Sequence, residues 1–108
     1  MHTEKQLKMV VLAMGWVEKP NCYVFGEEYW NYIEKYDLKK YLLSPEGSRA
    51  IQDYLIGESI SCGSWGNGRD DNIHVGIWGT AQEFDGYGDT FAEALLDACI
   101  KYLEGKDE

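Results

Sequence analysis

The chain has 108 residues, 44% of them hydrophobic, which predicts one domain over residues 1–108 with enough apolar side chains for a core. The formal net charge is −9, and residues 61–108 carry ten acidic against three basic side chains, a net charge of −7. This field repels phosphate backbones, so direct nucleic-acid binding is disfavoured. It suits a basic protein partner better, although an acidic surface that serves solubility alone explains the charge as well. The apolar runs are shorter than the about 20 residues that span a membrane, and the first residues lack the order of a signal peptide. We therefore expect a cytoplasmic protein without a membrane partner.

The three cysteines, Cys22, Cys62 and Cys99, are widely spaced and odd in number. A structural zinc site needs about four clustered ligands, and only His2 and His74 could join these thiols. The pattern predicts reduced thiols, with Cys99 packed inside a helix, and neither a metal site nor a cofactor.

The first predicted helix covers residues 3–14. Thr3 is a suitable N-cap, and Gln6 three residues later completes a capping box. Gly15 is the residue expected just beyond the helix C-terminus. One apolar stripe at helical spacing should face the core: Leu7, Val10, Val11 and Met14.

Residues 16–36 combine extended and aromatic segments. Residues 16–17 and 23–25 favour a short hairpin around a turn at Pro20–Asn21. The aromatic group that follows has no clear period and fits either a core or a binding patch. Its members are Tyr29, Trp30, Tyr32 and Tyr36.

A short helical turn is expected over residues 37–43, followed by a helix from Pro45 to about Ile56. Ser44 is a favourable N-cap, proline suits the first helical position, and Gly57 should stop the helix. Its apolar face would consist of Ala50, Ile51, Tyr54 and Leu55.

Residues 59–62 and 73–78 alternate between polar and apolar positions and predict a β-hairpin with its connection near residues 66–72. A further strand is expected over residues 80–84, with a loop over residues 85–89. One face of the second hairpin strand should carry Ile73, Val75 and Ile77.

The glycine-rich segment 63–68 could bring a backbone close to a phosphate. It lacks the Gly-Lys-Ser/Thr ending of a P-loop, and it precedes a strand, where no helix N-terminus can hold an anion. We interpret this segment as the hairpin loop.

The last predicted helix is the most strongly patterned element. Thr90 and Glu93 form a second capping box, and residues 104–108 should fray. The apolar stripe repeats at spacings of three and four residues and consists of Phe91, Ala94, Leu95, Ala98, Cys99, Tyr102 and Leu103.

No residue pattern identifies a catalytic site. His74 has no nucleophile-elbow partner, which favours a structural or surface histidine and a non-enzymatic protein. The acidic pair Asp70–Asp71 could hold a hard cation with help from Glu83 and Asp85. The spacing of an EF-hand is absent, so a solvated acidic loop is favoured.

Two segments supply the candidate binding residues, because Tyr and Trp combine a large apolar body with a polar tip and the hairpin connection is charged. They are Tyr29, Trp30 and Tyr32 from the aromatic stretch, and Trp65, Arg69, Asp70 and Asp71 from the hairpin.

The order of elements gives the chain a resemblance to a known family. Met14-Gly15-Trp16 ends the first helix, and Gly88-Asp89-Thr90-Phe91-Ala92-Glu93-Ala94 opens the last one. With the proline-started helix and the hairpin between them, the chain resembles the phage ABA-sandwich domain family. The resemblance implies an α-β-α layered fold and a bacteriophage origin, and it brings no catalytic residues.

The segment 88–95, with residues 102–104 behind it, is also similar to the closing helix of HicB-type antitoxins. This second resemblance covers about the last third of the chain. Those proteins place a sheet before the helix and neutralise a small basic toxin, so the resemblance implies a basic protein partner.

We therefore expect an α+β fold, an α-β-α sandwich with a small antiparallel sheet of three or four strands packed by helices. The expected function is that of a non-enzymatic phage or prophage accessory protein in the host bacterial cytoplasm, which binds and modulates or inhibits a host factor such as an anti-phage defence. Two alternatives remain open. One is an antitoxin or immunity-type protein that neutralises a basic partner. The other is a protein that sequesters a small ligand such as a nucleotide, in a homo-oligomer with sites between subunits.

Overall fold

The computed structural model describes residues 3–25, 32–66, 73–79 and 83–106. In chain order the elements are α1 (Glu4–Ala13), β1 (Trp16–Glu18), β2 (Cys22–Phe25), β3 (Tyr32–Glu34), the 3-10 turn η1 (Lys35–Asp37), α2 (Leu38–Leu42), α3 (Pro45–Gly57), β4 (Ser61–Gly66), β5 (Ile73–Trp78), β6 (Phe84–Gly88) and α4 (Phe91–Lys106). The strands form two antiparallel sheets, sheet A in the order β1-β2-β3 and sheet B in the order β4-β5-β6.

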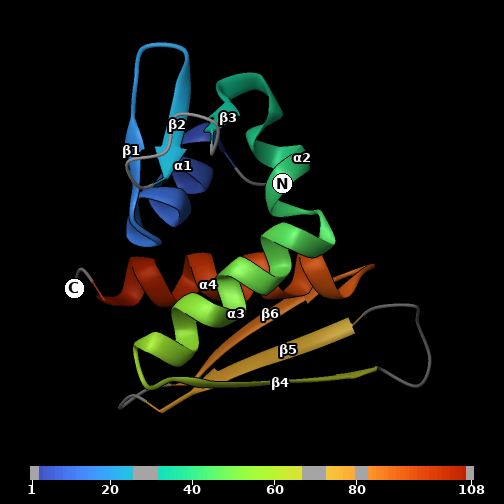
Figure 1. Cartoon of the computed structure of the whole chain (residues 1–108). Coiled ribbons are helices and arrows are strands. Elements are labelled where there is room, and N and C mark those ends of the chain that lie inside the picture. Colours follow the sequence, from blue (N-terminus) through green and yellow to red (C-terminus); the bar gives the residue numbers. More distant parts are fainter. Residues whose placement is uncertain (1–2, 26–31, 67–72, 80–82, 107–108) are drawn as a thin grey trace.

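Helix α4 lies across the middle of the molecule (Figure 1). Sheet B packs against it through β5 and β6, and α3 and α1 also contact it. Helix α1 in turn contacts β1 of sheet A, which lies at the opposite end of the molecule from sheet B (Figure 1). The expected α+β class, with a small antiparallel sheet packed by helices, is confirmed, except that the described strands form two such sheets of three strands each.

Helix α1 begins and ends as its sequence predicts. The Thr3 hydroxyl accepts the Gln6 N–H at 3.2 Å, and the Gln6 side chain accepts the Thr3 N–H at 2.9 Å. Gly15 follows with φ of +101°, a left-handed conformation that glycine adopts without steric cost. The predicted stripe is buried at Leu7, Val10 and Val11 and half-buried at Met14.

Sheet A contains the predicted hairpin and a third strand. Tyr23 and Ile33 are register partners on β2 and β3, and both are buried. Tyr32, one position before Ile33, is 53% exposed, and Tyr36 beyond the strand is 81% exposed. These two tyrosines are therefore surface residues and not core, while Tyr29 and Trp30 lie outside the described residues.

Helix α3 also follows its sequence signals. The Ser44 hydroxyl accepts the Gly47 N–H at 3.1 Å, Pro45 stands in the first turn, and the helix ends at Gly57. Gly47 lies so close to the backbone of Tyr41 that a Cβ there would overlap its carbonyl oxygen. On the predicted apolar face, Ile51 and Leu55 are buried, and Ala50 and Tyr54 are half-buried.

Three predictions in the C-terminal half are wrong. Residues 85–89 were predicted as a loop, but Phe84–Gly88 is strand β6, and its glycines are needed because α4 packs directly on the strand. The glycine-rich segment is not a loop over residues 63–66, which belong to strand β4. Helix α4 also continues through residues 104–106, where fraying was expected, and the Glu104 carboxylate accepts a hydrogen bond from Gln6 at 3.2 Å.

The core is centred on α4. In the described part of the chain, Val75 and Ile77 of β5 and Leu55 of α3 are buried in one cluster with the apolar residues of this helix, and Leu42 of α2 belongs to the same cluster. Cys99 is fully buried there as predicted, and burial raises the pKa of its thiol to about 12. In the described residues, no helix has the length and apolar character needed to cross a membrane.

Candidate functional site

Sheet B has one face covered by helices and one open face. Figure 1 shows α3 and α4 on the same side of the sheet. Because side chains alternate along a strand, the residues between the buried positions of β5 and β6 emerge on the other side. These residues form what we call the open face of sheet B, and they are His74, Trp78, Asp85 and Tyr87.

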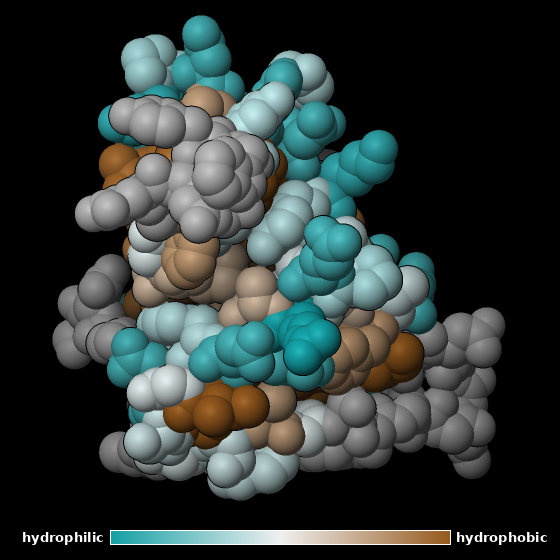
Figure 2. All heavy atoms as spheres, viewed as in Figure 1, coloured by the Kyte–Doolittle hydropathy of each residue, from teal (hydrophilic) through white to brown (hydrophobic). Residues whose placement is uncertain are grey.

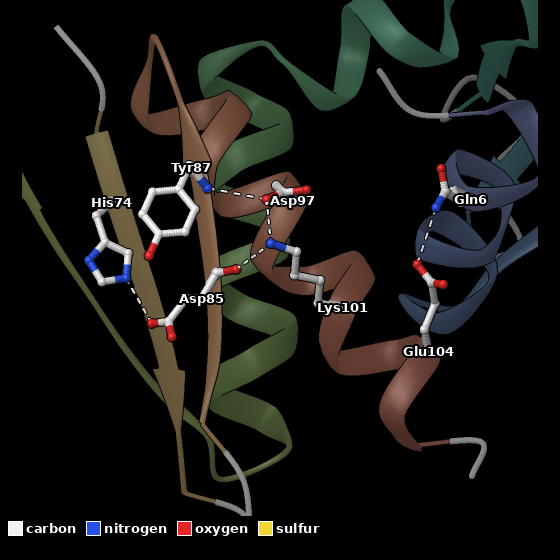
Figure 3. Close-up of polar contacts among 7 residues, drawn as sticks. All are labelled: Gln6, His74, Asp85, Tyr87, Asp97, Lys101 and Glu104. Atoms are coloured by element: carbon white, nitrogen blue, oxygen red, sulfur yellow. Dashed lines mark hydrogen bonds and ion pairs between the residues drawn. The ribbon is translucent and has the colours of Figure 1, made fainter. Parts of the chain in front are cut away.

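A histidine and a carboxylate are paired on the open face. The His74 Nε2 and Asp85 Oδ1 atoms lie 2.7 Å apart (Figure 3). Since an ionised carboxylate only accepts hydrogen bonds, Nε2 carries the proton. The His74 ring also stacks on Tyr87, its register partner, with ring centroids 4.7 Å apart and an interplanar angle of 9°. Two neighbours therefore fix the orientation of the imidazole.

Helix α4 holds β6 from behind the open face. The Tyr87 N–H donates to the Asp97 carboxylate at 3.2 Å, and Lys101 Nζ donates to the Asp85 carbonyl at 2.8 Å (Figure 3). Asp97 and Lys101 also pair with each other at 3.1 Å. Backbone groups that point away from β5 are thus satisfied by side chains of α4, which fixes the position of Asp85 and Tyr87 on the sheet.

The His74–Asp85 pair has one element of a catalytic site. A carboxylate that orients a histidine supports proton transfer when a nucleophile lies against the other ring nitrogen. The thiol of Cys62 is on the opposite side of the sheet, since Cys62 is the register partner of the buried Ile77. Among the described residues, no three His, Cys, Asp or Glu side chains are placed to share a metal ion.

A groove beside sheet A is the second candidate site. It has a volume of about 1060 Å³ and opens between α1, the β1–β2 hairpin and η1. Glu18 crosses it and pairs with Lys8 and Lys35, both at 3.0 Å. These hydrogen bonds lower the pKa of the Glu18 carboxyl, and the hydrogen bond that Lys8 donates to Glu18 raises the pKa of Lys8. Tyr32 also lines this groove.

The structure describes two of the seven predicted binding residues. Tyr32 lies at the groove beside sheet A, and Trp65 belongs to β4, where its backbone is the register partner of His74. The other five lie outside the described residues: Tyr29, Trp30, Arg69, Asp70 and Asp71. Trp78 and Tyr87 of the open face were not among the predicted binding residues. The alternation of side chains along the predicted strand 73–78 already indicated that Trp78 lies on the face opposite Ile77. Tyr87 could not be placed on this face, because residues 85–89 were predicted as a loop.

Comparisons with family models, with curated proteins and with solved structures find no match to this chain.

Proposed function

We propose that this protein is a non-enzymatic binding protein, a phage or prophage accessory protein that modulates a host protein by docking it on the open face of sheet B. The observation that carries the proposal is the pair of large side chains on that face, Trp78 at 41% and Tyr87 at 51% exposed. Exposed aromatic residues on a rigid sheet are favourable anchors, because they bury much apolar area at little entropic cost.

The charge around the open face supports a basic partner. Asp85 lies on the face, and three further acidic residues lie along its β6 edge: Asp89, Glu93 and Asp97. Among the described residues that contact this edge, Lys101 carries the positive charge. A partner rich in Lys and Arg would be attracted to this region, and its association would be fastest at low ionic strength.

The pairing on the open face also supports recognition. His74 and Tyr87 are held against each other, and Asp85 is held by both His74 and α4. Because these side chains are ordered before binding, a partner meets a preorganised surface and less entropy is lost on association.

The test is affinity purification from host cells, followed by affinity measurements with the recovered partner. Tyr87→Ala and Trp78→Ala should each raise the Kd on the order of 30-fold, because an anchor residue contributes about 2 kcal/mol or more. Tyr36→Ala removes a tyrosine that is 81% exposed away from sheet B and should leave the Kd unchanged. If both sheet B variants bind as the unmodified protein does, the proposal is wrong.

The groove beside sheet A favours one second candidate, a protein that sequesters a small anionic ligand such as a nucleotide. Two exposed tyrosines, Tyr32 and Tyr36, line it together with three lysines, Lys5, Lys8 and Lys35, whose charge is balanced by three glutamates. Lysines attract phosphate and aromatic rings stack on bases. Mass spectrometry of small molecules released from the same purified protein separates the two candidates. A nucleotide recovered without any protein partner supports this one.

A further inference from the structure

The edge strands of the two sheets are not equally protected. An edge strand presents unpaired backbone groups to solvent, and proteins protect such edges by short length, charge, proline or a covering element. In sheet A, β1 and β3 have three residues each. In sheet B, β6 is covered, since the Asp89 N–H donates to Glu93 at 3.0 Å and α4 also binds the backbone of Asp85 and Tyr87.

Strand β4 is the exception among the described edge strands. It has six residues, Ser61–Gly66, and none of them is charged or a proline. Within the described part of the chain, the backbone hydrogen bonds of β4 go to β5, and no backbone–backbone hydrogen bond joins β4 to another element. Strand β4 is an edge strand of sheet B, so its outer side is an edge to which another strand can add.

An apolar hollow lies directly beside this edge. It has a volume of about 680 Å³ and is lined by residues of α3, β4 and the start of α4, among them Gln52, Ile56, Cys62 and Phe91. Ile56 is 69% exposed. Figure 2 shows hydrophobic surface where the end of α3 meets β4. A strand added to β4 would cover this hollow and bury Ile56.

The exposed face of α3 beside the edge is self-complementary. Arg49 and Asp53 are both exposed and lie one turn apart, followed by Ile56. When two copies meet about a two-fold axis, the strands and the helices beside them run antiparallel, so the basic end of one stripe lies toward the acidic end of the other. Strand β4 itself brings no charged side chain to a contact between two chains of net charge −9.

We propose that β4 pairs with β4 of a second copy of this chain. The two sheets B then form one continuous antiparallel sheet of six strands with a closed two-fold interface. The asymmetry of sheet B limits this assembly to two copies, because the outer strand at each end is then β6, which α4 covers. In the dimer the two open faces lie side by side on one surface.

The first test is the mass of the whole protein by light scattering after size-exclusion chromatography, across the micromolar concentration range. We expect twice the mass of one chain. Ile56→Glu brings two carboxylates together at the interface and should weaken dimerisation on the order of tenfold or more. Tyr36→Glu adds the same charge at a site 81% exposed away from sheet B and should leave the dimer intact.

The second test is amide hydrogen exchange. Alternate amides of Ser61–Gly66 point away from β5, and pairing with a second copy should slow their exchange in the dimer and not in Ile56→Glu. A chain that stays monomeric at every concentration overturns the proposal. The proposal is also wrong if Tyr36→Glu lowers the measured mass to that of a monomer and Ile56→Glu does not. It is equally wrong if these amides exchange as fast in the dimer as in the monomer.

Discussion

At the scale of single residues, Gly86 decides how closely α4 approaches sheet B. A Cβ at this position would overlap the carbonyl oxygen of Ala94 and the amide nitrogen of Ala98, and both are backbone atoms of α4. A helix backbone cannot turn aside as a side chain can, so glycine is required for this approach. The same approach brings Asp97 and Lys101 within hydrogen-bonding distance of β6.

Gly86→Ala should therefore lower the free energy of unfolding by about 1–3 kcal/mol, because the added methyl forces strand and helix apart. Urea denaturation followed by circular dichroism measures the change. Gly57→Ala is the matched control, since a Cβ at Gly57 meets nothing within 4 Å. At the end of α3 it should raise stability, by at most about 1 kcal/mol. Equal effects from both substitutions would show that the close approach does not limit stability.

At the scale of elements, Glu18 connects three parts of the N-terminal half. Its carboxylate binds Lys8 of α1 and Lys35 of η1, while Glu18 itself belongs to β1. The network is exposed to solvent, so its contribution to stability is small and decreases with added salt. It is also dependent on pH, because both lysines bind the ionised form of the carboxyl group.

The pKa of Glu18 is lower in the folded protein than its usual value of about 4.5. A group with a lowered pKa stabilises the fold above its unfolded pKa and loses this contribution as the pH falls through the folded pKa. Glu18→Gln should therefore have a slightly lower melting temperature than the unmodified protein at pH 7, and this difference should shrink as the pH falls below about 4.5 and disappear once the folded carboxyl is protonated. Thermal denaturation over this pH range measures it, with Glu83→Gln at an exposed site as control. A difference that persists unchanged in acid would contradict the assignment.

Local signals were sufficient for some elements and not for others. The helices α1 and α3 could be predicted because Thr3 and Ser44 are caps whose bonds lie within four residues. Strand β6 could not be predicted in this way. Gly86 is needed because α4 packs closely on the strand, but in the sequence alone a glycine at this place indicates a turn. The open face was missed for the same reason, since His74 and Asp85 are eleven residues apart and meet through the register of β5 and β6.

At the scale of the whole molecule, α4 is the element on which the other parts depend. It contacts β5 and β6 on one side and α3 and α1 elsewhere, so its burial requires both halves of the chain. Cys99 in this helix is fully buried, and its pKa of about 12 keeps the thiol protonated at neutral pH. The thiol can react only when the helix leaves the core.

Labelling of Cys99 should therefore report global unfolding. In a chain carrying Cys22→Ser and Cys62→Ser, a thiol reagent at pH 8 should modify Cys99 at the rate set by the global unfolding equilibrium. The dependence of this rate on urea should match the slope from circular dichroism. The labelling rate is checked by mass spectrometry, with the fully unfolded chain as the reference for the intrinsic reaction. Rapid labelling without denaturant would show that α4 opens locally.

The packing of β6 against α4 has a consequence for how the chain reaches its native state. The two elements are joined by Asp89 and Thr90 alone, so their contacts close very short loops and can form early in folding. Helix α1, in contrast, meets α4 across most of the sequence, as its Gln6–Glu104 bond shows. A growing polypeptide makes α1 first and α4 much later. The part of α1 that packs on α4 therefore has to remain uncovered during most of synthesis, while the contacts of α1 with β1 and α2 can form earlier.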